Sequence, residues 1–192
     1  MLGPRASYGG NDPKSHEPGL ILFTTKPHWA MGWIMTLEEE IGIILTERGE
    51  TMAIAESLTG GLVANMVTDV PGSSAYLLEG IVAYANESKM ERLGVAEDTL
   101  IAHGAVSEEV ACEMAEGVRS VLGTDWGIST TGIAGPTGDT EDKPLGLVYY
   151  AVASDGGTVV RRAVFSGDRL DVKRASAEAA LALLLVSLEE NV

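Results

Sequence analysis

The sequence predicts an α/β fold, namely a three-layer α/β/α sandwich around a mixed, mostly parallel five-stranded sheet that ends in a β-hairpin. Short apolar stretches, which are typical of buried strands, alternate with longer stretches of helical periodicity. Such alternation favours parallel strands joined by right-handed helical crossovers. The last two apolar stretches, 147–154 and 158–166, are separated only by Asp-Gly-Gly, which is typical of an antiparallel hairpin.

Capping residues mark the ends of the predicted helices. Thr36 and Glu39 have the spacing of a capping box, and Gly49 suits the end of that first helix. Asn86 is a good N-cap for the helix after the second strand, and Ser107 caps the next long helix. In chain order, we expect a helix over 36–49, a strand over 52–56, a helix over 60–70, a strand over 80–85, helices over 86–94 and 108–123, strands over 125–132, 147–154 and 158–166, and a last helix over 170–188.

A polar stretch at 133–146 follows the third predicted strand and contains no credible helix or strand of its own. Loops of this length are uncommon in compact domains and are often functional. We therefore expect this loop to contribute to a site.

The first 34 residues differ in composition from the remainder of the chain. Residues 1–19 are rich in Gly, Pro and Ser and show no period, and residues 20–34 are more apolar. We expect 1–34 to be a flexible or loosely packed N-terminal extension. Residues 35–192 are expected to fold as one domain.

Composition excludes several classes of partner. The formal net charge of −15 makes nucleic acid and anionic membranes poor partners for the surface as a whole. Cys112 is the single cysteine, and the three histidines lack metal-ligand spacing, so we expect no disulfide, no metal and no cofactor. The sequence contains neither a membrane-spanning apolar run nor a signal-peptide pattern, and we expect a cytoplasmic protein.

Segments whose side chains can react or bind a ligand are predicted to meet at one edge of the sheet. In open α/β sheets, ligands bind at the carboxyl ends of the parallel strands. Ser57 follows the first strand, Tyr84 and Lys89 lie at the end of the second, and 130–136 at the end of the third. An antiparallel hairpin would bring 167–169 to the same edge.

Each of these segments has simple chemistry to offer. The turn at 59–61 leads into a helix, so we expect free N–H groups there. The Gly-rich loop after the third strand and Arg169 can both hold a phosphate. Lys89, if desolvated, can act as a base toward Ser57. Taken one at a time, the residues have simpler interpretations: Ser57 as a helix cap, Lys89 as a solvated lysine, Tyr84 as a core residue and Glu56 as a surface acid.

Five motifs, in order, resemble the pattern of the CinA carboxyl-terminal domain family, the nicotinamide mononucleotide deamidases. They are AESLTGG, DVPGSSAYLLEGIVAYANESKMERLGV, HGAVSEEVA, TGIAGPTGDTEDKPLGLVYYA and FSGDR. The resemblance runs from about Thr36 to Leu188, which is essentially the whole folded part. Jointly these motifs are highly specific.

The resemblance implies an amidohydrolase that converts the carboxamide of nicotinamide mononucleotide to nicotinate mononucleotide and ammonia, a step in pyridine-nucleotide salvage. Ser57 matches the nucleophile of the family, and Lys89 and Tyr84 match the residues proposed to work with it. The positions expected around the substrate are Thr59, Gly60, Gly61, Thr131, Gly132, Ala134, Gly135 and Arg169.

In the expected mechanism, neutral Lys89, directly or through Tyr84, takes the proton from Ser57. Backbone N–H groups near Gly60 and Gly61 would stabilise the oxyanion. The phosphate would lie on the loop after the third strand or on Arg169, and the sequence leaves both open.

The chain departs from the family pattern at Leu58, where the family usually has a cysteine. Because Ser57 and Thr59 remain, we expect catalysis to survive. Larger family members carry an amino-terminal nucleotide-processing domain, which we expect this chain to lack. Family precedent favours a homodimer. The alternatives are a non-catalytic nucleotide-binding or regulatory module of the same fold, and an amidase that acts on a related nucleotide amide.

Overall fold

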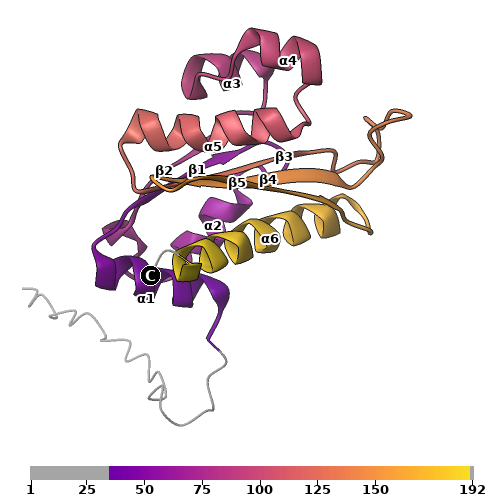
Figure 1. Ribbon diagram of the computed structural model, residues 1–192. Helices are drawn as coiled ribbons and strands as arrows, with labels where there is room; N and C mark the ends of the chain where they lie inside the picture. The colour runs from indigo at the N-terminus through magenta and orange to yellow at the C-terminus, as the bar shows by residue number, and fades with distance from the viewer. Residues whose placement is uncertain (1–34, 191–192) are drawn as a thin grey trace, which may run out of the picture. The chain divides into compact units, whose positions relative to one another are not determined.

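The structure is a computed structural model that describes residues 35–190 (Figure 1). The N-terminal extension expected at 1–34 lies outside the described residues. The described elements are α1 (Leu37–Arg48), β1 (Met52–Glu56), α2 (Leu62–Thr68), the 3-10 turn η2 (Ser73–Ala75), β2 (Leu77–Val82), α3 (Asn86–Leu93), α4 (Glu97–His103), α5 (Glu108–Leu122), β3 (Trp126–Gly132), β4 (Leu147–Ser154), β5 (Gly157–Val164) and α6 (Arg169–Glu190).

The five strands form one mixed sheet in the order β2-β1-β3-β4-β5, which confirms the predicted class. β1 pairs in parallel with both β2 and β3, whereas the β3–β4 and β4–β5 pairs are antiparallel. Four strands therefore run in one direction and β4 runs in the other. The chain leaves β1 toward β2 on one side and reaches β3 on the other side. The connections that follow β1 and β3 therefore lead away from each other. A ligand crevice is expected between them, at the carboxyl ends of these two strands.

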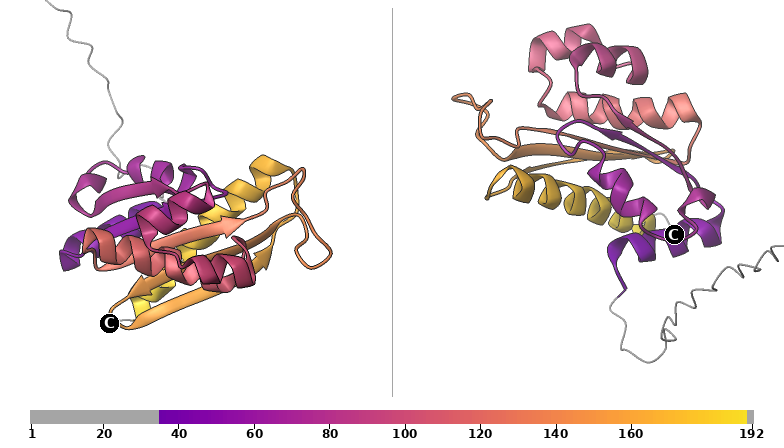
Figure 2. Two further views of the ribbon diagram at one scale, coloured as in Figure 1. Left: turned by 90° about the horizontal axis from the view of Figure 1, so that it is seen from above. Right: turned by 180° about the vertical axis from the view of Figure 1, so that it is seen from behind.

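Helices cover both faces of the sheet. α1, α2 and α6 lie on one face and α5 on the other, as the views from the front and from behind show (Figures 1 and 2). α3 and α4 pack against the outer side of α5. The predicted three layers are therefore present, with one further helical pair outside them.

The caps predicted for two helices are confirmed. Thr36 Oγ1 accepts from the Glu39 N–H, and the Glu39 carboxylate accepts from the Thr36 N–H, which completes the capping box of α1. Gly49 closes this helix in the left-handed conformation with φ 65°. Ser107 Oγ accepts from the Val110 N–H at the start of α5.

The second strand was predicted three residues too late. β2 ends at Val82 because its ladder ends opposite Glu56, the last residue of β1. Tyr84, placed in the strand by the 80–85 prediction, lies beyond the strand. The predicted N-cap at Asn86 is also wrong. Asn86 is the first residue of α3, Ala85 precedes it, and no side chain caps the helix.

Sequence reasoning missed α4 for a physical reason. Its N-cap position is Ala96, which has no side chain to cap the helix, and Ile101 is 76% exposed. Glu113 of α5 caps the helix instead, since its carboxylate accepts from the Ala96 N–H at 2.8 Å and from Thr99 Oγ1 at 2.6 Å. Such a tertiary cap leaves no local pattern at the start of the helix.

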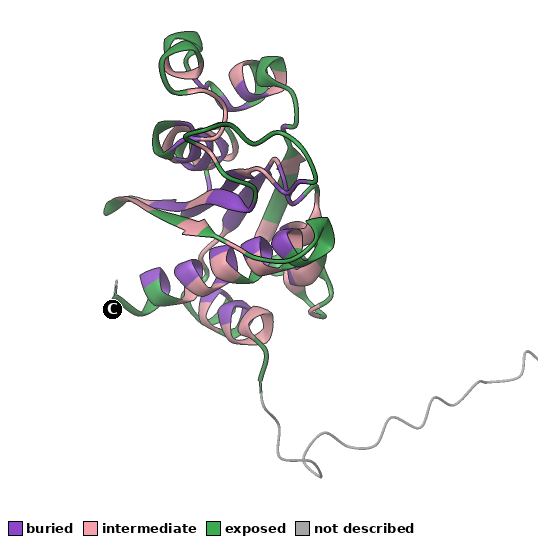
Figure 3. Cartoon of the chain, turned by 90° about the vertical axis from the view of Figure 1, so that its right-hand side faces the viewer, coloured by how far each residue is buried: buried purple, intermediate pink, exposed green. Residues whose placement is uncertain are grey.

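The two faces of the sheet have different cores. Large aliphatic side chains of α1 and α6 pack on one face. On the opposite face the sheet presents alanines, and α5 packs on them with Ala111 and Ala115 as well as with Val110, Met114 and Val118. Figure 3 shows the buried residues concentrated in the sheet and on the inward sides of its helices. Small side chains allow a close approach, and Gly117 of α5 lies so near α3 that a Cβ would be 1.9 Å from the Leu93 carbonyl oxygen. Among residues 35–190, no helix combines the length and apolar character that a membrane crossing requires.

Candidate active site

Ser57 follows β1 directly and lies at the edge of the sheet that the sequence predicted. Its backbone N–H donates to the Thr130 carbonyl at 3.0 Å, which ties the residue to the end of β3. Its side chain is half-buried, and Oγ lies 3.2 Å from Lys89 Nζ. The serine and the lysine, 32 positions apart in sequence, therefore form a hydrogen-bonded pair.

Lys89 comes from α3 and is 1% exposed. Within residues 35–190, no carboxylate forms an ion pair with its Nζ. Burial lowers the pKa of the Lys89 ammonium below its usual value, because an apolar environment disfavours the charged form. The interpretation of Lys89 as a solvated lysine is therefore wrong.

The other two partners of Lys89 orient its amine. Nζ lies 2.9 Å from the Ala83 carbonyl oxygen and 3.1 Å from that of Tyr84. Carbonyl oxygens only accept hydrogen bonds, so a neutral amine directs its two N–H groups at these two atoms. Its lone pair then faces Ser57 Oγ, the geometry that a general base requires.

Glu56, the last residue of β1, was not among the predicted site residues. It is 1% exposed, so its interpretation as a surface acid is wrong. Its carboxylate accepts from the N–H groups of Gly61, Val63 and Ala64 at 2.9, 3.2 and 2.9 Å. A carboxylate at a helix N-terminus is favourable, and this one fixes the turn that carries Ser57. In the sequence, the only indication of this role was the position of Glu56 directly before Ser57.

The cap by Glu56 changes the predicted oxyanion site. The Gly61 N–H is occupied by the carboxylate and is not free, contrary to expectation. The N–H groups of Leu58, Thr59 and Gly60 make no hydrogen bond to another residue of the described chain. The predicted donor at Gly60 therefore remains a candidate for stabilising an oxyanion, and the N–H groups of Leu58 and Thr59, directly after Ser57, are two further candidates.

Two threonines expected around the substrate have buried hydroxyls that bind the protein. Thr59 Oγ1 lies 2.7 Å from Thr130 Oγ1, and Thr131 Oγ1 donates to the Ala105 carbonyl at 2.7 Å. Thr59 is completely buried and Thr131 is 1% exposed. Their side chains fasten the ends of β1 and β3 to neighbouring segments.

Arg169 connects two of the predicted segments. Its Nη1 donates to the Gly135 carbonyl at 2.8 Å, and its Nη2 donates to the Tyr84 hydroxyl at 3.2 Å. Tyr84 is 60% exposed, which excludes a core role. Its hydroxyl therefore contacts Arg169, whereas its backbone carbonyl is the part that contacts Lys89.

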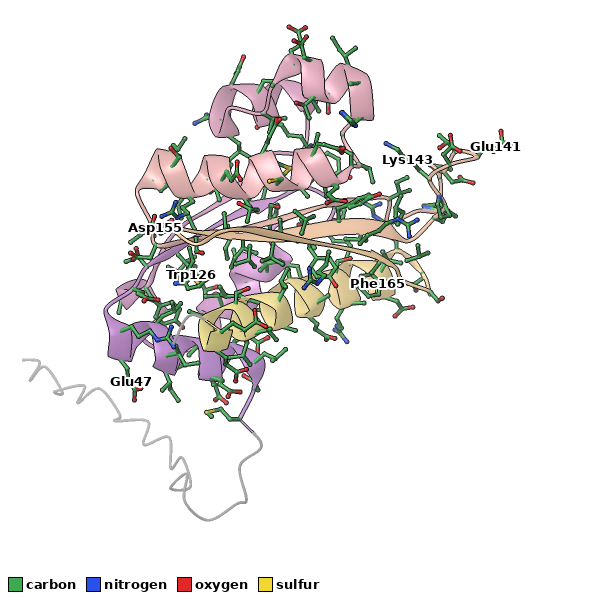
Figure 4. All side chains as sticks on the ribbon, in the orientation of Figure 1. Glu47, Trp126, Glu141, Lys143, Asp155 and Phe165 are labelled. Carbon is green, nitrogen blue, oxygen red and sulfur yellow. The ribbon has the colours of Figure 1, made fainter. Side chains whose placement is uncertain are left out.

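The loop after β3 lies beside Arg169 and lines a cleft of about 630 Å³ with the segment after β5. Gly132 pairs with Val148, Ala134 is buried, and Gly135 adopts φ 78°. Figure 4 shows Lys143 and Phe165 at this end of the sheet, opposite Asp155. The four segments predicted to meet at one edge do so, because Ser57 contacts Lys89 and Thr130, and Arg169 contacts Gly135 and Tyr84.

Leu58, the departure from the family pattern, is 3% exposed and points into a small apolar cluster. Its buried neighbours there are Ala134, Val148 and Val172. A leucine at this position therefore fills the space between the serine turn, the loop and α6.

Among the described residues, no group of three or more His, Cys, Asp and Glu side chains is arranged to hold a metal ion.

Comparisons with known proteins point to one family. The model of the family described as the CinA C-terminal domain matches residues 34–188. A CinA-like protein of Chloroherpeton thalassium is 53% identical over 154 residues, covering 78% of this chain and 37% of that protein. The chain thus spans little more than a third of the length of this curated relative.

Two crystal structures share the fold over nearly their whole length. The competence damage-inducible protein A of Klebsiella pneumoniae is 35% identical with a TM-score of 0.77, and the match covers 80% of this chain and 95% of that one. The competence/damage inducible protein CihA of Agrobacterium tumefaciens is 35% identical with a TM-score of 0.75, covering 83% and 99%.

Proposed function

Because the chain belongs to the CinA C-terminal domain family, we propose that it hydrolyses the carboxamide of nicotinamide mononucleotide to nicotinate mononucleotide and ammonia. One observation carries the proposal. Lys89 is buried without a carboxylate partner in the described chain, and its Nζ lies 3.2 Å from Ser57 Oγ. Burial lowers the pKa of Lys89 and so favours its neutral form, and a neutral amine beside a serine can activate the hydroxyl as a nucleophile.

In the first half of the proposed reaction, Ser57 Oγ attacks the carboxamide carbon while its proton moves to Lys89 Nζ. The N–H groups of Leu58 and Thr59 stabilise the oxyanion, and each such donor is typically worth about 3–4 kcal/mol. The C–N bond then breaks, Lys89 returns the proton to the leaving nitrogen, and ammonia departs. A nicotinoyl ester remains on Ser57.

Water completes the reaction. Neutral Lys89 takes a proton from the water as its oxygen attacks the ester carbon. The bond from that carbon to Ser57 Oγ breaks, and Lys89 returns the proton to the serine. The direct contact between Lys89 and Ser57 favours proton transfer without Tyr84 as a relay, because the Tyr84 hydroxyl hydrogen-bonds to Arg169.

The decisive experiment incubates the protein with nicotinamide mononucleotide in EDTA and measures ammonia. We expect release by the unchanged protein and by the control Ser120→Ala, on the exposed side of α5, but only background release by Ser57→Ala. Calorimetry should show that Ser57→Ala still binds the nucleotide, because the one side-chain hydrogen bond that Ser57 makes within residues 35–190 is to Lys89. Full activity of Ser57→Ala would disprove the covalent mechanism.

The same assay separates the alternative functions. Tight binding without ammonia release from the unchanged protein would favour a non-catalytic nucleotide-binding module. Equal rates with nicotinamide, its riboside and its mononucleotide would favour an amidase of broader range.

A further inference from the structure

Lys143 lies in the polar loop at 133–146 and joins it to a distant part of the chain (Figure 4). Its Nζ donates to the His103 carbonyl at 2.6 Å and to the Val106 carbonyl at 2.8 Å. Both acceptors belong to the turn between α4 and α5. Lys143 therefore connects the loop after β3 to the helices on the outer side of the fold.

The turn at 103–106 is fitted to this loop in two further ways. Its Ala105 carbonyl accepts from Thr131 Oγ1, near the end of β3, at 2.7 Å. Gly104 leaves room for the lysine, because a Cβ at this position would lie 3.1 Å from Lys143 Nζ. The turn therefore receives both the end of β3 and the loop that follows it.

The loop borders the candidate active site. Its Ala134 lies in one apolar cluster with Leu58, the residue directly after Ser57. Its Gly135 carbonyl accepts from Arg169 at 2.8 Å, and the loop forms one wall of the cleft of about 630 Å³. A shift of the loop would therefore change both the wall of the cleft and the packing behind the serine.

We propose that Lys143 is a positioning residue that holds the loop at 133–146 where it shapes the cleft for the substrate. The inference deepens the proposed function and takes the identity of the substrate from it. In the described chain, the side-chain hydrogen bonds that join this loop to other elements come from Lys143 and Arg169. Near its tip, the loop has a turn in which the backbones of Thr140 and Lys143 exchange hydrogen bonds of 2.9 and 3.3 Å. The Lys143 side chain ties this turn to the α4–α5 connection.

The lysine binds carbonyl oxygens although acids are close to it in sequence. Asp139, Glu141 and Asp142 are exposed, and within residues 35–190 none of them forms an ion pair with Lys143. Exposed ion pairs hold a loop weakly, whereas hydrogen bonds from a charged donor are among the stronger ones. Lys143 is half-buried, so water competes less for its two acceptors than at an exposed position.

Hydrogen exchange tests this anchor without any reaction. Lys143→Met removes the ammonium and keeps an aliphatic side chain, whereas Lys143→Arg keeps donors for the two carbonyls. Glu141→Gln, near the tip of the same loop, is the matched control that removes one charge. We expect backbone amides of 133–146 to exchange about 10- to 100-fold faster in Lys143→Met, and at their normal rate in the control.

Kinetics then test whether the anchor matters to the substrate. Lys143→Met should raise KM for nicotinamide mononucleotide about 10-fold with little change in kcat, because the loop binds the substrate alike before and during the reaction. Lys143→Arg should recover most of the affinity, and Glu141→Gln should keep the normal KM. A purely structural role would not produce this division between KM and kcat.

The two measurements separate the possible outcomes. Normal loop exchange in Lys143→Met would overturn the anchor. Faster exchange with an unchanged KM would overturn its role in shaping the cleft. If the unchanged protein releases no ammonia, the amidohydrolase is refuted. Faster loop exchange together with weaker nucleotide binding in calorimetry would then still support the positioning role of Lys143.

Discussion

Lys89 is the residue whose environment departs most from that of an ordinary lysine. Burial lowers its pKa, so a larger neutral fraction is present near neutral pH than for a solvated lysine. The neutral form is the base, and kcat should therefore rise as pH increases through the lowered pKa and level off above it. A pH profile of ammonia release measures this. A rate that falls over that range would contradict the assignment.

Replacement of Lys89 should abolish this pH dependence. Lys89→Met removes the base, and general bases contribute about 10²- to 10⁴-fold to the rate. We expect kcat to fall by that amount, with binding of nicotinamide mononucleotide retained in calorimetry. Near-normal kcat in this variant would require a different base.

Glu56 is predicted to position Ser57 without touching the substrate. Glu56→Gln has only one carbonyl oxygen for three N–H donors, so at least one buried donor loses its acceptor. We expect the free energy of unfolding to fall by about 1–3 kcal/mol in urea titrations. Glu47→Gln, on the exposed side of α1, is the control and should change stability little. An equal free energy of unfolding for both variants would show that the Glu56 cap does not stabilise the fold.

At the scale of elements, the contact between α3 and α5 places Lys89. Gly117→Ala adds a Cβ only 1.9 Å from the Leu93 carbonyl oxygen, one turn beyond Lys89. Overpacking of this kind costs about 1–3 kcal/mol, and we expect it to exceed the gain in helix propensity of alanine over glycine. Thermal unfolding should show a lower Tm, and kcat should fall because α3 shifts. Ser120→Ala, exposed on the same helix, should show neither effect.

The helices and strands also show which sequence patterns were sufficient to predict their boundaries. The capping box at Thr36, the cap at Ser107 and the hairpin of β4 and β5 depend on neighbouring residues, and all three were predicted. The start of α4 depends on Glu113, which is distant in sequence, and was missed. The end of β2 depends on the length of β1, and was misplaced.

At the scale of the whole molecule, we propose a homodimer, which rests on family precedent. Several large apolar side chains are more than half exposed, including Leu78, Ile101, Val121 and Leu170. Exposed apolar surface is compatible with association. Light scattering should give twice the chain mass of 20.1 kDa at micromolar concentration. A mass equal to one chain at all concentrations tested would contradict the dimer.

The sequence alone determined the α/β class, the strand and helix order apart from α4, and the edge where Ser57, Lys89 and Arg169 meet. Hydrophobic periodicity and helix capping are local properties of the sequence. The helical connections between strands then indicate that these strands run parallel. Contacts between side chains were decided only by the tertiary structure. The desolvation of Lys89, the capture of the Gly61 N–H by Glu56, and the pairing of Tyr84 with Arg169 each depend on residues that come together only when the chain folds.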